Sequence, residues 1–171
     1  WSYASSITLD TEGNIYTTGY FRGTVDFDPS EGTHELTSNG STFISILSSN
    51  GSFIGAYQFE NGESGSSRTY SITLDEQGNI YTTGQFWGTV DFDPSGETHE
   101  LTSSSQSSFI SILSSDGSFI GAYQFENGEN GYSSANSITL DGQGNIYTTG
   151  YFGGTVDFDP SGNTYNLTSS N

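Results

Sequence analysis

The chain has 171 residues, and its 20 acidic side chains face two arginines and no lysine, for a net charge of −18 at pH 7. Such a surface repels nucleic acid and anionic lipid, so both are excluded as partners, and a cation or a solvated acidic coat is expected instead. Without cysteine, and without an apolar run near the ~18 residues of a membrane span, neither disulfides nor membrane insertion is expected. Twenty-three glycines beside 15% aromatic residues favour short strands and tight turns over disorder.

The first predicted element is a hairpin. Residues 6–9 and 14–21 alternate in polarity, and the Asp-x-x-Gly-Asn turn between them places Asp10 to bond the turn backbone and Gly13 at positive φ. A shorter pair of strands, GTVDFD at 23–28 and THELTS at 33–38, is predicted next, with Pro29 ending its first strand. A second hairpin follows, in which FISILSS and GSFIGAYQF flank the Asn50-Gly51 turn.

This order of elements repeats along the chain. SITLD begins at Ser6, Ser71 and Ser137, and FISILSS begins at Phe43 and Phe109. The sequence therefore predicts an all-β chain of tandem antiparallel-sheet units, each about 65–66 residues long and similar to a propeller blade. The predicted units and their modules are 1–65 (A module 6–38, B module 43–63), 66–131 (A module 71–103, B module 109–129) and the partial unit 132–171 (A module alone).

The repeated strings also resemble a known family. LDxxGNIYTTGxFxGTVDFDP followed by FISILSSxGSFIGAYQFE is similar to the SBBP-type β-propeller repeats of bacterial secreted and surface proteins. The resemblance covers all A and B modules; it implies a blade fold and an extracellular or cell-surface setting, and it implies no enzyme activity. Two and a half blades do not close a ring, so an open array is expected; a linear solenoid or a stack of sandwich-like units is the alternative.

The best candidate for chemistry is a repeated Asp-x-Asp pair. Residues i and i+2 of a strand project to the same face, and paired carboxylates beside a turn carbonyl suit Ca²⁺. The alternative is a solvated pair whose second member caps the Pro-Ser turn. The candidate Ca²⁺ ligands are Asp26, Asp28, Asp91, Asp93, Asp157 and Asp159.

Two further kinds of site are considered. An exposed aromatic ladder could stack on sugars, with packing inside the sheet as the alternative reading; its members would be Tyr16, Tyr20, Tyr81, Trp87, Tyr147 and Tyr151. The N-glycosylation motif begins at Asn39, Asn50 and Asn166.

Three functions follow in order of preference. The first is an extracellular structural protein, a fibre or surface-layer subunit whose ends are completed head to tail by copies of itself. The second is an adhesive or carbohydrate-binding propeller fragment that uses Ca²⁺. A hydrolase comes last, because no nucleophile–base pair or metal cluster is recognisable, so the chain is not expected to be an enzyme. The chain starts at Trp1 and contains no Met, so we expect a processed chain or a segment of a longer one.

Overall fold

The computed structural model describes residues 1–169, and the predicted all-β fold is confirmed there. Strands follow one another without any helix in this range, so no helix long and apolar enough to cross a bilayer is found in it. The strands are β1 (Ser2–Leu9), β2 (Ile15–Asp26), β3 (Glu35–Leu47), β4 (Phe53–Gln58), β5 (Glu60–Asn61), β6 (Ser66–Leu74), β7 (Ile80–Asp91), β8 (Glu100–Leu113), β9 (Phe119–Gln124), β10 (Tyr132–Leu140), β11 (Ile146–Asp157) and β12 (Asn166–Ser169).

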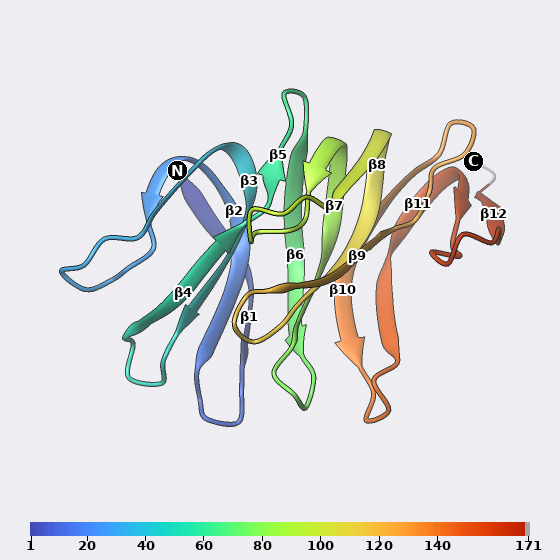
Figure 1. Ribbon diagram of the computed structural model, residues 1–171. Coiled ribbons are helices and arrows are strands. Elements are labelled where there is room, and N and C mark those ends of the chain that lie inside the picture. The colour runs from blue at the N-terminus through green and yellow to red at the C-terminus, as the bar shows by residue number, and fades with distance from the viewer. Residues whose placement is uncertain (170–171) are drawn as a thin grey trace.

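The strands form three antiparallel sheets that stand side by side and do not close into a barrel (Figure 1). The first sheet has the order β1-β2-β3-β4. The second repeats that order as β6-β7-β8-β9, with the short β5 on the same edge of β7 as β6. The third contains β10-β11-β12. Each sheet is thus one blade-like unit, and consecutive units meet face to face.

The predicted pairing of GTVDFD with THELTS is confirmed, but the prediction that they form separate short strands was wrong. Those segments are the far halves of the two central strands, because β2 and β3 pair with each other on both sides of Arg22, from Ile15–Leu47 to Asp26–Glu35. A β-bulge interrupts the pairing between Phe21 and Gly23, and Gly23 has a φ of 86°, which a residue with a side chain rarely adopts. The bulge bends each central strand without ending it.

The same bulge explains why the repeat spacing changes by one residue. In the first sheet the strand opposite the bulge passes from Ser38 to Ser41, and in the second from Ser103 to Ser107. The second sheet therefore has one more residue there, while the registers on both sides are equivalent. An insertion at a bulge leaves the side-chain alternation of both flanking segments intact.

The hydrophobic core lies between the sheets. Its centre is a cluster of phenylalanine rings in which Phe59, from the chain just after β4, meets Phe92 and Phe109 of the second sheet at centroid distances of 4.9 and 6.0 Å. Phe59 is only 1% exposed. Aromatic rings supply large buried area per residue, which lets a chain with 30% hydrophobic residues form a core.

Buried hydroxyl groups complete the contact between sheets. Thr42 and Thr69 join their hydroxyls at 2.9 Å across the first interface, and both residues are fully buried. The backbone N–H of Ser108 donates to the Ser133 hydroxyl at 2.9 Å across the second. Because buried polar groups are tolerated only when hydrogen-bonded, these pairs fix how one sheet sits on the next.

Each repeat also donates a short segment to the sheet that follows. β5 lies inside the predicted unit 1–65, yet Glu60 and Asn61 pair with Asp91 and Val90 of β7. An isolated bridge between Asn127 and Val156 repeats this contact at the next junction. Neighbouring sheets are therefore joined through the backbone as well as through packing.

Candidate functional site

The Asp-x-Asp pairs lie where β2, β7 and β11 end, and their carboxylates bind backbone amides. Oδ1 of Asp91 accepts hydrogen bonds from the N–H of Asp93 at 3.0 Å and of His99 at 2.8 Å. Oδ1 of Asp93 accepts one from the N–H of Ser95 at 2.8 Å. The same network recurs around Asp26 and Asp157, with Tyr165 in the position of the histidine in the third sheet.

These bonds hold the loop that joins the two long central strands. They also stabilise the ionised carboxylate, so the backbone N–H groups of His34 and Asp28 lower the pKa of Asp26. The Asp159 pKa is lowered in the same way, first by the Ser161 hydroxyl and then by its N–H. The first and second members of each pair thus both cap the loop, whereas the sequence suggested capping by the second member alone.

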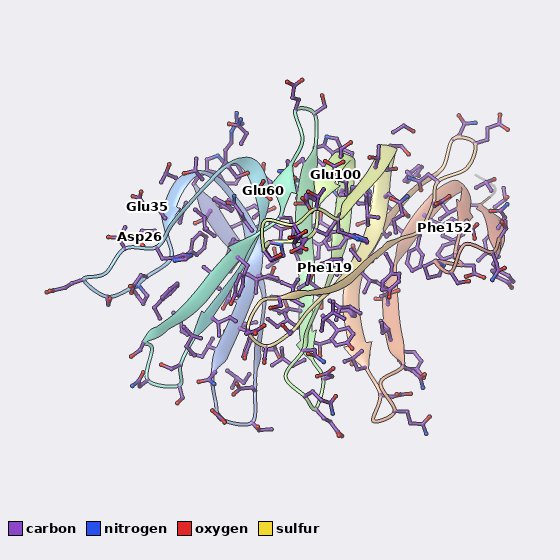
Figure 2. The ribbon with its side chains drawn as sticks, in the orientation of Figure 1. Asp26, Glu35, Glu60, Glu100, Phe119 and Phe152 are labelled. Carbon is purple, nitrogen blue, oxygen red and sulfur yellow. The ribbon has the colours of Figure 1, made fainter. Side chains whose placement is uncertain are left out.

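An acidic row that was missed from the sequence adjoins the second pair. Asp91 lies opposite Glu100 of β8 on one side and opposite Glu60 of β5 on the other. Both glutamates are exposed, and both are labelled in Figure 2. Like charges directly opposite each other in a sheet destabilise it, so this row favours counterions. Within residues 1–169, however, no three His, Cys, Asp or Glu side chains converge as a metal-binding group. Binding of Ca²⁺ stays a prediction.

Glu60 could not be connected with Asp91 from the sequence, because β5 crosses to the following sheet. The sequence came closer to placing Glu100 beside Asp91, because GTVDFD and THELTS were predicted to pair. The register of that pair was not assigned. Asp26 and Glu35 form the equivalent opposed pair in the first sheet, while Asn166 replaces the glutamate in the third. The acidic row is therefore most highly charged in the second sheet.

The turn aspartates, by contrast, behave as the sequence predicts. Oδ1 of Asp141 accepts from the N–H groups of Gln143 and Asn145, and Oδ2 accepts from the Asn145 amide at 2.8 Å and from the Tyr147 hydroxyl at 3.1 Å. The Asn145 contacts are the main reason that the pKa of Asp141 falls to about 2. These carboxylates are fully used in shaping the turns.

The predicted aromatic ladder is not one exposed surface. Tyr16 and Tyr20 are 5% and 6% exposed because the second sheet covers them, whereas Tyr147 and Tyr151 of the third sheet are 54% and 52% exposed. Tyr81 is partly buried against the third sheet, and Trp87 is 38% exposed. Equivalent tyrosines thus pack in the core between sheets and reach solvent on the last sheet.

The glycosylation candidates Asn39, Asn50 and Asn166 are all exposed. Asn39 lies opposite the bulge, Asn50 lies in the β3–β4 turn, and Asn166 begins β12. Their modification stays a prediction. His34 and His99 lie just before β3 and β8, and their rings pack on Phe53 and Phe119 at centroid distances of 4.8 and 4.6 Å.

Comparison with known families adds one finding to this geometry. The model of the SBBP β-propeller repeat matches residues 2–20 and 124–151. These two segments are similar to the SBBP β-propeller repeat. No curated protein matches the chain.

The matched segments show which part of the fold the SBBP model describes. Residues 2–20 contain β1 and the first half of β2. Residues 124–151 begin at the last residue of β9 and continue through the connection into β10 and the first half of β11. The SBBP repeat therefore includes the passage of the chain from one sheet to the next. The equivalent passage at the first junction, which lies outside the matched residues, carries the Phe59 and β5 contacts.

Proposed function

We propose that this SBBP-repeat chain is an extracellular structural protein that assembles with copies of itself through the outer faces of its first and third sheets. One observation carries the proposal: side chains that are buried between sheets inside the array are exposed on its outer faces. Ile72 and Ile138 are each 5% exposed, while the equivalent Ile7 is 65% exposed. Exposed apolar surface with a complementary counterpart elsewhere on the same molecule favours head-to-tail contacts.

The opposite face of the array carries the matching surface. Tyr16 packs in the first interface and is 5% exposed, while its counterpart Tyr147 is 54% exposed on the third sheet. A second copy whose first sheet takes the place of the next blade would cover Ile7 and Tyr147 together. The contact would repeat the internal interfaces, and a repeated heterologous contact that does not close produces a filament.

Backbone contacts at the internal interfaces support the same arrangement. The N–H of Ile72 donates to the Ser6 hydroxyl at 3.4 Å, and the N–H of Ile138 donates to the Ser71 hydroxyl at 3.3 Å. In the proposed assembly, the N–H of Ile7 in one copy would donate to the Ser137 hydroxyl of the copy whose third sheet it covers. The net charge of −18 would keep the sides of such filaments apart, because like-charged surfaces repel.

The test compares two isoleucines that are similarly exposed. Ile7→Asp places a charge on the proposed interface, while Ile54→Asp places it on β4, where Ile54 is 50% exposed and its counterpart Ile120 is 51% exposed in the next sheet. Sedimentation velocity over a concentration series and negative-stain electron microscopy measure assembly. Filaments or large oligomers are expected for the parent chain and for Ile54→Asp, and single chains for Ile7→Asp.

Two results would contradict the proposal. The parent chain could sediment as a single chain at all concentrations, or Ile7→Asp could assemble as well as the parent. Circular dichroism of both variants checks that the sheets remain folded. The proposal assigns no catalytic step, and repeating the measurement with Ca²⁺ and with EDTA shows whether the acidic rows bind cations that strengthen assembly.

A further inference from the structure

The three repeats are nearly identical in their strands but differ at a few clustered positions. The strings SITLD, GNIYTTG and GTVDFDPS are the same in all three. The strand positions that change in all three are the first, third and fifth residues of each unit and the position just before the bulge glycine. These are Trp1/Ser66/Tyr132, Tyr3/Arg68/Ser134, Ser5/Tyr70/Asn136 and Arg22/Trp87/Gly153. Two further positions alternate, as Ala4/Thr69/Ala135 and Tyr20/Gln85/Tyr151.

These positions are neighbours in the fold, and we call them the variable edge. Tyr3 pairs with Tyr20, Arg68 with Gln85, and Ser134 with Tyr151 in the registers of the three sheets. Ser66 pairs with Trp87 in the same way. The first strands β1, β6 and β10 all start on the upper side of Figure 1, so the three sheets present their variable residues toward one side of the array.

The variable residues also contact one another across the junctions between sheets. The Arg68 guanidinium lies over the Tyr20 ring, 5.0 Å from its centroid. Burial raises the pKa of Tyr70, and the neighbours that act on its hydroxyl are Arg68, Tyr3 and Tyr151, which come from all three sheets. Near the same edge, the Gln106 amide from the bulge of β8 donates to the Tyr151 hydroxyl at 3.1 Å. The variable residues of the three sheets therefore lie near one another, with Gln106 beside them.

Aromatic rings dominate the exposed part of this surface. Trp1 is 67% exposed and lies parallel to Tyr3, with ring centroids 6.0 Å apart and an interplanar angle of 15°. Tyr132 and Tyr151 add a second aromatic pair on the third sheet at 6.4 Å. The two tryptophans and the two arginines of the chain all occupy variable positions. The chain has a net charge of −18 and no lysine, so both of its basic side chains apart from histidine lie at this edge.

We propose that the variable edge is a binding surface for an oligosaccharide. Flat exposed rings stack on the apolar face of a pyranose, and the surrounding guanidinium, amide and hydroxyl groups can hydrogen-bond its ring hydroxyls. Arg68 adds a charged donor to this surface, because its guanidinium is held over the Tyr20 ring. A fixed framework with Tyr, Trp, Arg, Ser and Asn varied at one edge is also the composition of surfaces that evolve for recognition.

The experiment uses an array of neutral and uronic-acid-containing oligosaccharides, probed with the whole labelled chain. Each saccharide that binds is then titrated in solution while tryptophan emission is recorded, since Trp1 and Trp87 both lie in the variable edge. The test variants are Tyr3→Ala and Tyr151→Ala, and each is expected to weaken binding about tenfold, as for the loss of a central aromatic contact. Comparison of the neutral and acidic saccharides shows whether Arg68 selects a carboxylate.

The matched control is Tyr147→Ala. Tyr147 lies on the same strand as Tyr151 and is similarly exposed, at 54% against 52%, but a tyrosine is present at its position in all three repeats. It is expected to bind the saccharide as the parent chain does. An array without binding overturns the proposal, and so does binding that Tyr3→Ala and Tyr151→Ala leave unchanged. The proposed assembly would cover Tyr147 and Tyr151 as the second sheet covers Tyr16 and Tyr20. All binding measurements therefore use the Ile7→Asp background, whose substitution lies outside the variable edge, and this separates the result from the assembly test.

Discussion

The Phe59 ring shows how much one residue contributes to the junction between sheets. It is 1% exposed and inserts among the rings of the second sheet. Truncation of a buried phenylalanine leaves a cavity as well as losing transfer free energy, so Phe59→Ala should lower the free energy of unfolding by about 3–5 kcal/mol. Chemical denaturation followed by circular dichroism measures this change.

Phe125 provides the control for that substitution. It is the equivalent residue at the next junction, but it is only partly buried and meets Phe158 at 5.3 Å. Phe125→Ala should therefore cost clearly less than Phe59→Ala. Equal losses in the two variants would show that insertion into the phenylalanine cluster is not what stabilises the first junction.

Asp141 gives a residue-level prediction of pH dependence. Hydrogen bonds led by those from Asn145 lower its pKa from 3.8 to about 2 in the folded chain. A depressed folded-state pKa contributes stability above the unfolded pKa of 3.8, and this contribution is lost as the pH falls toward 2. Asp141→Asn should therefore reduce the melting temperature at pH 5 and change it little at pH 2. A constant difference between the two proteins over this range would refute the role of the ionised carboxylate.

At the scale of the element, the loop between the two long central strands depends on the first aspartate of each pair. Asp91→Ala removes the acceptor of two backbone N–H groups, with an expected loss of about 1 kcal/mol for each hydrogen bond. Asp91→Asn keeps a side-chain oxygen in the same place and should be nearly neutral in melting experiments without Ca²⁺.

The same two variants test the Ca²⁺ hypothesis. If the acidic row binds Ca²⁺, the cation should raise the melting temperature of the parent chain, and EDTA should reverse the rise. Asp91→Asn should lose this response while keeping the loop intact, because an amide is a weaker ligand than a carboxylate for a hard cation. A response unchanged in Asp91→Asn would place any bound Ca²⁺ elsewhere.

At the scale of the whole molecule, stability should depend on how many interfaces between sheets are completed. Tyr57 donates to the carbonyl oxygen of Asp116 in the next sheet at 2.7 Å, whereas its counterpart Tyr123 is 43% exposed. A chain extended after residue 171 by a copy of residues 106–131 should give the third sheet its β8 and β9 counterparts and cover Tyr123. Repeat arrays gain stability from each added interface, so the melting temperature should rise by about 2–4 °C per kcal/mol gained.

The control for this extension has the same length, with the copied phenylalanines and isoleucines changed to serine. The melting temperature of this control chain should equal that of the parent chain. Hydrogen exchange of the β9 amides adds a local measurement, because covering Tyr123 should slow exchange there. An equal rise in both extended chains would mean that added length, and not a completed interface, stabilises the array.

Much of this architecture could be predicted from the sequence because its local signals agree. The Asp10 turn and the Asn50-Gly51 hairpin are local features, and repetition identified the unit. What could not be predicted depends on contacts between units. The bulge glycine Gly23 looked like the start of a new strand, and β5 gave no sign that it would pair with β7. The candidate carboxylates were found, but their use by backbone amides depends on loop geometry.

The phenylalanine that each repeat inserts into the next sheet has a consequence for folding. Because the strands of successive repeats are almost the same, the ring cluster of one sheet accepts the corresponding segment of another repeat, or of another molecule, nearly as well as its own neighbour. Only the short covalent connection after β4 gives the correct partner an advantage, through its high effective concentration. During synthesis from the N-terminus the correct neighbour is also the first to emerge, whereas a fully unfolded chain must choose among copies that compete on equal terms.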